Sequence, residues 1–123
     1  MTKITPIKPK TETIDATRVP LGRLASKVAI ILRGKNLPGF TPYLDHQVTI
    51  KITNASKMGV TGTKITDKMY TRHSGYPGSL RKTSLGEVIT KKGASEAIRR
   101  AVRGMLPPNR MRAKLLKRLI IEE

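Results

Sequence analysis

The stretch Leu21–Arg33, with the sequence LGRLASKVAIILR, decides the fold class of this 123-residue chain. Its apolar residues recur three and four positions apart, which is the spacing of one face of an amphipathic α-helix. Pro20 suits the first turn because its missing N–H costs nothing there, and Gly34 stands where a C-terminal cap belongs. The stretch predicts a helix whose buried face contains Leu21, Leu24, Ala25, Val28, Ala29, Ile31 and Leu32.

Strand patterns flank this helix. Thr13–Ala16 is a candidate short strand, and Val48–Thr53 alternates apolar and polar residues, as in a strand with one wet face or an inner strand whose polar positions are covered. Further along, the patterns predict extended pieces at 58–62 and 68–73, a loop at 74–79, a helix opened by Ser84 and ended by Gly93, a helix over 97–105, a short helix after Asn109 and a strand at 119–121. Alternating strands and helices predict an α/β sandwich.

Length and composition bound the organisation of the chain. A hydrophobic content of 37% excludes a wholly disordered basic tail, and we expect one domain over residues 12–123 after a basic arm at residues 1–11. The absence of cysteine excludes disulfides and thiolate chemistry and fits a reducing cytoplasm. No apolar run approaches the roughly 18 residues of a membrane span. A basic membrane-surface helix is disfavoured because the chain has no Trp and only Phe40 as phenylalanine.

Positive charge is the strongest functional signal. The formal net charge is +17, and the segment from Arg99 to Arg118, which we call the basic segment, carries eight positive side chains and no acidic one. Six of the eight are arginines, whose planar fork suits bidentate phosphate contacts. Solvated helices usually interleave Glu with Lys, which this segment does not do. We therefore expect a polyanion as partner, and a folded RNA fits best because few aromatic residues are present for base stacking.

Catalytic and metal chemistry find little support. The carboxylates are scattered, Asp15 is expected to be buried, and His46 and His73 share no metal-ligand spacing. We interpret both histidines as surface or loop residues able to meet a phosphate or ribose. Residues 59–62, GVTG, match the backbone-clamping loop of KH domains, but a tight turn after a strand is the favoured interpretation.

Several collinear motifs resemble those of the universal L-thirteen family of bacterial large-subunit ribosomal proteins. The resemblance covers about residues 13–121. Its motifs are Asp15-Ala16-Thr17, Leu21-Gly22-Arg23-Leu24-Ala25-Ser26, Arg33-Gly34-Lys35, Phe40-Thr41-Pro42, Asn54-Ala55-Ser56-Lys57, Val60-Thr61-Gly62-Thr63-Lys64, Asp67-Lys68-Met69-Tyr70, His73-Ser74-Gly75-Tyr76-Pro77-Gly78 and Ala101-Val102-Arg103-Gly104-Met105-Leu106-Pro107.

The resemblance implies a three-layer α/β/α sandwich around a four-stranded, mainly parallel sheet, with basic terminal extensions. It also implies a structural role in the cytoplasmic ribosome, bound to large-subunit rRNA early in assembly, beside neighbouring large-subunit proteins. No catalysis, cofactor, metal, membrane or small-molecule substrate is expected. The RNA-facing residues carried over by motif are Lys35, Thr41, Lys57, Thr61, Lys64, Lys68, Arg72, His73, Gly75, Arg103, Gly104, Arg110 and Lys114. To these we add Arg81, Lys82, Arg99, Arg112 and Lys117.

Two departures from the family pattern affect these expectations. The loop at residues 43–47 is shortened, and the chain ends at Glu123 without the longer tail of many members, so contacts from both places are in doubt. Two other classes compete. A nucleoid-type DNA-binding protein is supported by charge alone, and an enzyme acting on phosphorylated substrates would need a convergent acid/base pair involving residues such as His73 and Asp15.

Overall fold

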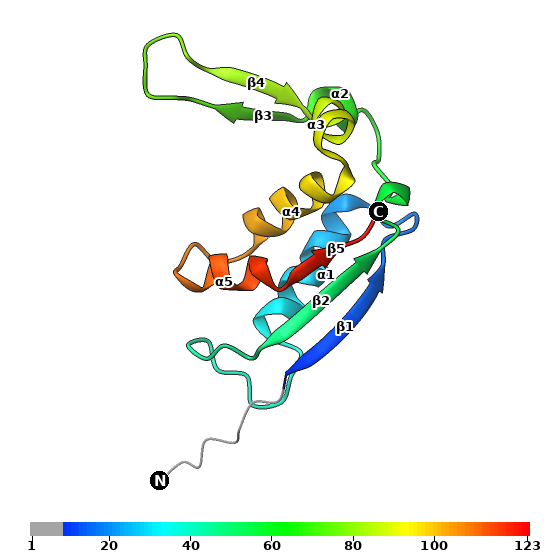
Figure 1. The fold of residues 1–123 in the computed structure, drawn as a ribbon, viewed down its shortest axis with the longest axis vertical. Coiled ribbons are helices and arrows are strands. Elements are labelled where there is room, and N and C mark those ends of the chain that lie inside the picture. Colours follow the sequence, from blue (N-terminus) through cyan, green and yellow to red (C-terminus); the bar gives the residue numbers. More distant parts are fainter. Residues whose placement is uncertain (1–8) are drawn as a thin grey trace.

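A parallel sheet of three strands forms one side of the core in the computed structural model, which describes residues 9–123 (Figure 1). The strands are β1 (Lys10–Asp15), β2 (Val48–Thr53) and β5 (Leu119–Ile121), and β2 lies between the other two. The predicted strands at 48–53 and 119–121 are confirmed. β1 begins earlier than expected, so Lys10 and Thr11 of the expected arm belong to the sheet, while residues 1–8 lie outside the described part of the chain.

The two faces of this sheet differ in polarity. Val48, Ile50 and Ile52 of β2 are buried at 1%, 0% and 0% exposure, and their side chains share a face with Ile14 and Leu119 of the neighbouring strands. The opposite face carries the half-buried polar residues of β2, among them Lys51, whose ammonium forms an ion pair of 3.0 Å with Glu122. The alternation therefore marks a strand with one polar face, which offers little apolar surface for a second helical layer.

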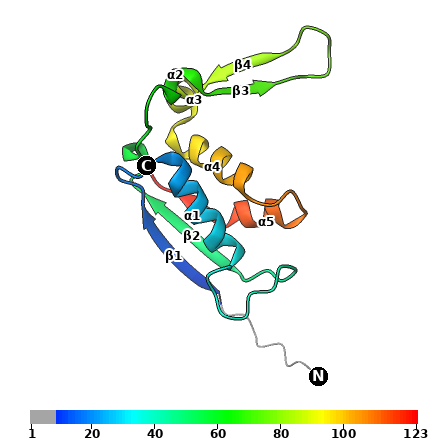
Figure 2. The same ribbon diagram turned by 180° about the vertical axis from the view of Figure 1, so that it is seen from behind.

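Helix α1 (Leu21–Arg33) covers the apolar face, as Figure 2 shows from behind. Its buried side chains are Leu24, Ala25, Val28, Ala29, Ile31 and Leu32, all of them members of the predicted stripe. The helix ends at Gly34, whose φ of +79° is left-handed and whose N–H donates to the Ile31 carbonyl at 3.0 Å. The predicted helix and its glycine cap are thus confirmed.

Helix α4 (Ala94–Met105) packs against α1 and adds Ile98 and Val102 to the same core. The chain then passes Pro107-Pro108 and enters α5 (Met111–Lys117), where the Asn109 side-chain oxygen accepts from the Met111 N–H at 3.1 Å. Asn109 therefore stabilises the turn into the short final helix, although the N-cap position itself is taken by Arg110, one residue later than predicted. α5 leads directly into β5 and so closes the sheet against β2.

A β-hairpin projects away from this core in Figure 1. After the short η1 (Ala55–Lys57) and α2 (Lys64–Asp67), β3 (Met69–Arg72) pairs antiparallel with β4 (Arg81–Ser84), and α3 (Leu85–Lys92) leads back to α4. The predicted loop at 74–79 lies at the tip of the hairpin. The Ser84 hydroxyl accepts from the Glu87 N–H at 3.2 Å, which confirms the predicted cap of α3.

The expected four-stranded sheet and three-layer sandwich are not confirmed in residues 9–123. The extended piece predicted at 58–62 contributes one isolated bridge, between Gly59 and Pro20, and the piece at 68–73 pairs with β4 outside the main sheet. The physical reason lies in the side chains: β3 and β4 are mostly exposed and lack the apolar alternation that would bury them in a core. What holds is the coarser expectation of an α/β fold with a parallel sheet.

Candidate nucleic-acid interface

The projecting hairpin, residues 69–84, gathers cationic side chains without any carboxylate of its own. Arg72 lies directly opposite Arg81 in the pairing of β3 with β4, and both are exposed. At the tip, the Gly75 N–H donates to Nδ1 of His73 at 2.9 Å. Like charges directly opposite each other destabilise a hairpin. The structure thus brings together five predicted site residues, Arg72, His73, Gly75, Arg81 and Lys82.

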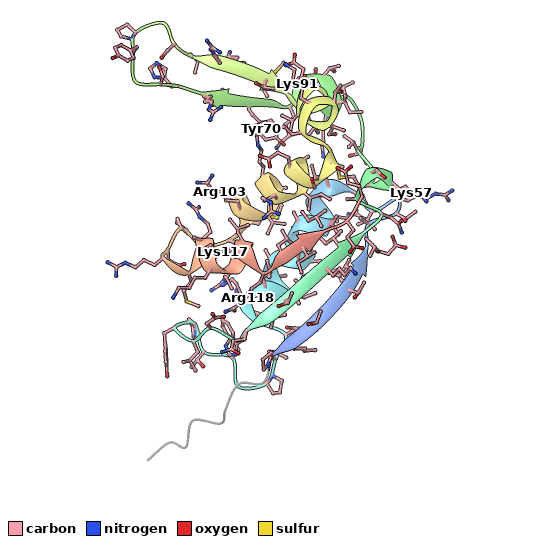
Figure 3. The ribbon with its side chains drawn as sticks, in the orientation of Figure 1. Lys57, Tyr70, Lys91, Arg103, Lys117 and Arg118 are labelled. Carbon is pink, nitrogen blue, oxygen red and sulfur yellow. The ribbon has the colours of Figure 1, made fainter. Side chains whose placement is uncertain are left out.

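A second group of predicted residues lies on α4, α5 and the turn between them. Four are exposed (Arg103, Arg110, Lys114 and Lys117), and two are partly buried (Arg99 and Arg112). Arg99 has an internal partner, because its Nη1 donates to the Leu116 carbonyl at 3.3 Å. In Figure 3 the Arg103 side chain points outward from α4 on the side toward which the hairpin projects.

Two arginines of the basic segment are neutralised inside the protein. Arg100 forms an ion pair of 3.0 Å with Glu96, one turn earlier on α4. Arg118 binds both carboxylate oxygens of Asp45, and this hydrogen bonding holds the pKa of Asp45 below its ordinary value. The charge that faces outward is therefore smaller than the eight cations of the segment, and neither of these two arginines was among the predicted contacts.

A cleft of about 600 Å³ lies at the base of the hairpin. Four predicted residues line it: Thr61, Lys64, Lys68 and Gly104. The sequence reasoning missed Tyr70 and Arg100, whose guanidinium lies 4.9 Å from the centroid of the Tyr70 ring. Burial raises the pKa of Tyr70, and its buried hydroxyl has no hydrogen-bond partner within residues 9–123. No local pattern links these two residues, because the contact joins β3 to α4.

The remaining predicted residues do not join these groups. Lys57 points away from the molecule on the side opposite to Arg103 (Figure 3). Lys35 is exposed just after α1, and Thr41 lies in the loop that follows, where its N–H donates to Nε2 of His46 at 3.3 Å. The interpretation of His46 as a histidine free to meet phosphate is wrong, because it is 7% exposed and stacks on Phe40 with the ring centroids 5.6 Å apart.

Asp15 is exposed, contrary to the expectation of a buried carboxylate. It accepts hydrogen bonds from the Thr17 hydroxyl and N–H at 2.7 and 2.9 Å, and from the Asn54 amide at 3.2 Å. These bonds, that of the Thr17 hydroxyl first, lower the pKa of Asp15. Asp15 therefore holds the turn after β1 and forms no pair with His73, which lies at the hairpin tip.

The GVTG segment forms a connection and no helix-flanked clamp. Gly59 pairs with Pro20, and Gly62 has a φ of +63° at the turn into α2. The favoured interpretation, a tight turn, agrees with this geometry. Residues 9–123 contain no group of three or more His, Asp or Glu side chains that could hold a metal ion, and none of their helices is long and apolar enough to span a membrane.

A small parallel α/β core with a projecting basic hairpin and outward-facing arginines has the clustered positive charge that is typical of nucleic-acid-binding proteins. Comparison with known proteins names the family. A family model described as "Ribosomal protein L13" matches residues 10–121, and the chain belongs to this family.

Three relatives illustrate the similarity, each with the name "Large ribosomal subunit protein uL13". The protein of Listeria welshimeri is 47% identical over 97% of this chain and 81% of its own length. The corresponding figures are 45%, 97% and 83% for Pelobacter propionicus, and 47%, 97% and 82% for Natranaerobius thermophilus. The resemblance noted from the motifs is thereby confirmed. As a member of a ribosomal protein family, the chain is a structural protein of the ribosome and not an enzyme.

Proposed function

We propose that this protein is a structural constituent of the large subunit of the cytoplasmic ribosome, where it binds and stabilises large-subunit rRNA early in assembly. The names of its relatives support the subunit. Contacts with phosphates and with the shape of the folded RNA provide the binding, and neighbouring large-subunit proteins complete its surroundings. The eighteen predicted residues are the proposed RNA contacts, with the hairpin and the α4–α5 group as the two main surfaces.

The hairpin is the observation that carries this proposal. Arg72 and Arg81 face each other with no carboxylate between Met69 and Ser84 to separate their charges. Such an arrangement costs stability in the free protein. A phosphate backbone lying along the hairpin removes this cost, because it neutralises both arginines and releases its own condensed counterions.

Sedimentation tests the proposed location. Tagged protein in a cell lysate is expected to migrate with the large subunit through a high-salt wash and to be released by RNase. Pulse labelling is expected to find it in the earliest precursor particles, which tests the early role in assembly. Release by DNase alone would instead support the nucleoid alternative, and recovery as a free species would contradict a ribosomal role.

Salt dependence tests the contacts. Replacing Arg103 and Arg110 together by Ala is expected to weaken binding to large-subunit rRNA and to flatten the plot of log affinity against log salt by roughly two phosphate contacts. The matched control replaces Lys91 and Lys92, which are exposed on α3 and are not proposed contacts. An equal slope of log affinity against log salt for the two double variants would show that Arg103 and Arg110 do not contact the RNA.

A further inference from the structure

The cleft at the base of the hairpin combines an apolar floor with a cationic rim. Pro20 and Leu21 at the start of α1, Val60, and Ala101 and Met105 on α4 supply apolar surface. At the rim, Lys64 is the first residue of α2 and Lys68 follows its last residue, and both are exposed. At about 600 Å³ the cleft falls within the size range of small-ligand sites. A ligand that complements both parts of the cleft would combine a flat or apolar part with negative charge.

Tyr70 and Arg100 supply a stacking surface within this cleft. The Arg100 guanidinium lies 4.9 Å from the Tyr70 ring centroid and is held there by its ion pair with Glu96. The Lys68 ammonium lies 5.8 Å from the same ring. Unstacked bases bind on aromatic rings and on guanidinium planes, while their phosphates bind to nearby cations.

From this arrangement we propose that the cleft holds the base of one unstacked RNA nucleotide, with the adjoining phosphate on Lys64 and Lys68. The inference rests on the proposed RNA binding and names one site within it. Asp67, the one carboxylate among the lining residues, accepts from the Thr63 hydroxyl and provides an acceptor for the amino group of a base.

Charge favours a nucleotide over an apolar protein segment as the occupant. Arg100 is already paired with Glu96, but the two lysines at the rim form no ion pair within residues 9–123. An apolar segment would cover the floor and would leave the two ammonium groups without a counterion. A nucleotide satisfies both parts of the cleft, because it carries an aromatic base and a phosphate.

Filling the cleft tests the proposal. Gly104→Trp places a large side chain in the wall, where a new Cβ meets no atom within 4 Å, so the fold is expected to tolerate it. The control is Ile30→Trp, which enlarges an exposed residue on α1 outside the cleft. We expect the first variant to bind large-subunit rRNA about five-fold or more weakly than the wild type and the second to bind equally well. Equal affinity of both variants would overturn the proposal.

A second pair of variants guards against a folding defect. Tyr70→Phe keeps the ring and is expected to retain the wild-type affinity, whereas Tyr70→Leu is expected to lose about as much as Gly104→Trp. Equal affinities of the Phe and Leu variants would overturn stacking on this ring. Circular dichroism of each variant verifies that the helices are present.

Ultraviolet cross-linking of intact large subunits, followed by mass spectrometry, locates the nucleotide. We expect adducts on the peptides that contain Tyr70 and Met105. Adducts confined to the hairpin tip and α5 would overturn the cleft while leaving the proposed RNA binding intact, and no adduct anywhere would contradict both. Loss of a neighbouring protein from particles carrying Gly104→Trp, with unchanged rRNA affinity, would identify a protein segment as the occupant and overturn the nucleotide.

Discussion

Replacing Arg81 by Glu is expected to stabilise the hairpin of the free protein and to weaken its binding to RNA. Arg81 lies directly opposite Arg72, and residues 69–84 contain no carboxylate. The substitution converts a repulsive cross-strand pair into an attractive one, while it places a negative charge where a phosphate is proposed to lie. Arg81→Gln is the matched neutral control.

The register of the hairpin sets the size of the effect on stability. Opposite charges directly across a strand pair contribute roughly 0.2–1 kcal/mol, and like charges cost a similar amount, so the reversal is worth about 0.5–1.5 kcal/mol at low salt. Amide hydrogen exchange of residues 69–84 is the suitable assay, because the hairpin projects from the core and its strands are mostly exposed, which favours local opening. Exchange should slow about two- to ten-fold in the Glu variant. In the Gln variant the gain in free energy should be roughly half as large, so exchange should slow less.

Binding to large-subunit rRNA should move in the opposite direction. Loss of one phosphate contact lowers the slope of log affinity against log salt by roughly 0.7–0.9 between about 50 and 200 mM salt. Both variants are expected to show this change, and the Glu variant is expected to bind more weakly at every salt concentration. The affinities can be measured by filter binding with the full chain.

Two results would refute this reasoning. Faster amide exchange in the Glu variant than in the wild type would show that the opposed arginines do not strain the free hairpin. Unchanged salt slopes in both variants would show that Arg81 does not contact RNA. The two measurements are independent, so each half of the argument stands or fails separately.

Two further substitutions test the loop that follows α1. Gly34→Ala is expected to destabilise the protein by more than about 1–2 kcal/mol, because a left-handed φ of +79° is combined with a Cβ only 2.7 Å from the His46 ring. Urea unfolding measures this loss, and Gly39→Ala, with a φ of +78° but open space around it, should lose less; equal losses would show that the His46 ring moves aside. Asp45→Asn is expected to lower the free energy of unfolding by about 1 kcal/mol at neutral pH, because it removes the charge that Arg118 binds. Arg118 lowers the folded-state pKa of Asp45. The difference in free energy of unfolding between the variant and the wild type should therefore persist above about pH 5 and shrink as the pH falls through that pKa. A difference that does not depend on pH would contradict the ion pair.

Local patterns were enough to predict the elements that build the core. The period of Leu21–Arg33 identified α1, and the alternation in Val48–Thr53 identified β2. The cap at Ser84 and the turn stabilised by Asn109 were also predictable, because each hydrogen bond joins residues only two or three positions apart. Such features depend on neighbouring residues, and the sequence displays them directly.

Features that depend on distant contacts were missed. β4 (Arg81–Ser84) has the sequence RKTS, which contains no apolar residue to reveal a strand, and only its pairing with β3 makes it one. The burial of His46 depends on the hollow beside Gly34, where a side chain at that position would collide with the ring. The exposure of Asp15 follows from its place on the polar face of the sheet.

The candidate site shows the same division. Charge and family motifs predicted which residues are available to contact RNA, and the structure groups most of them on the hairpin, on α4–α5 and at the cleft. The contact between Tyr70 and Arg100 could not be predicted, because it joins two elements that are distant in the sequence. The contacts of the eighteen residues with RNA stay a prediction, and the variants of Arg81, Arg103, Gly104 and Arg110 test four of them.

The hairpin has a consequence for how proteins of this fold can change over evolution. Its two ends are held together by a hydrogen bond of 3.0 Å from the Leu85 N–H to the Lys68 carbonyl. The hairpin is therefore connected to the rest of the protein at a single place. Lengthening such an excursion costs little, since each doubling of a loop adds only about 0.6 kcal/mol of closure entropy. The length of the hairpin and the stability of the core are therefore independent of each other, and selection can change one without changing the other.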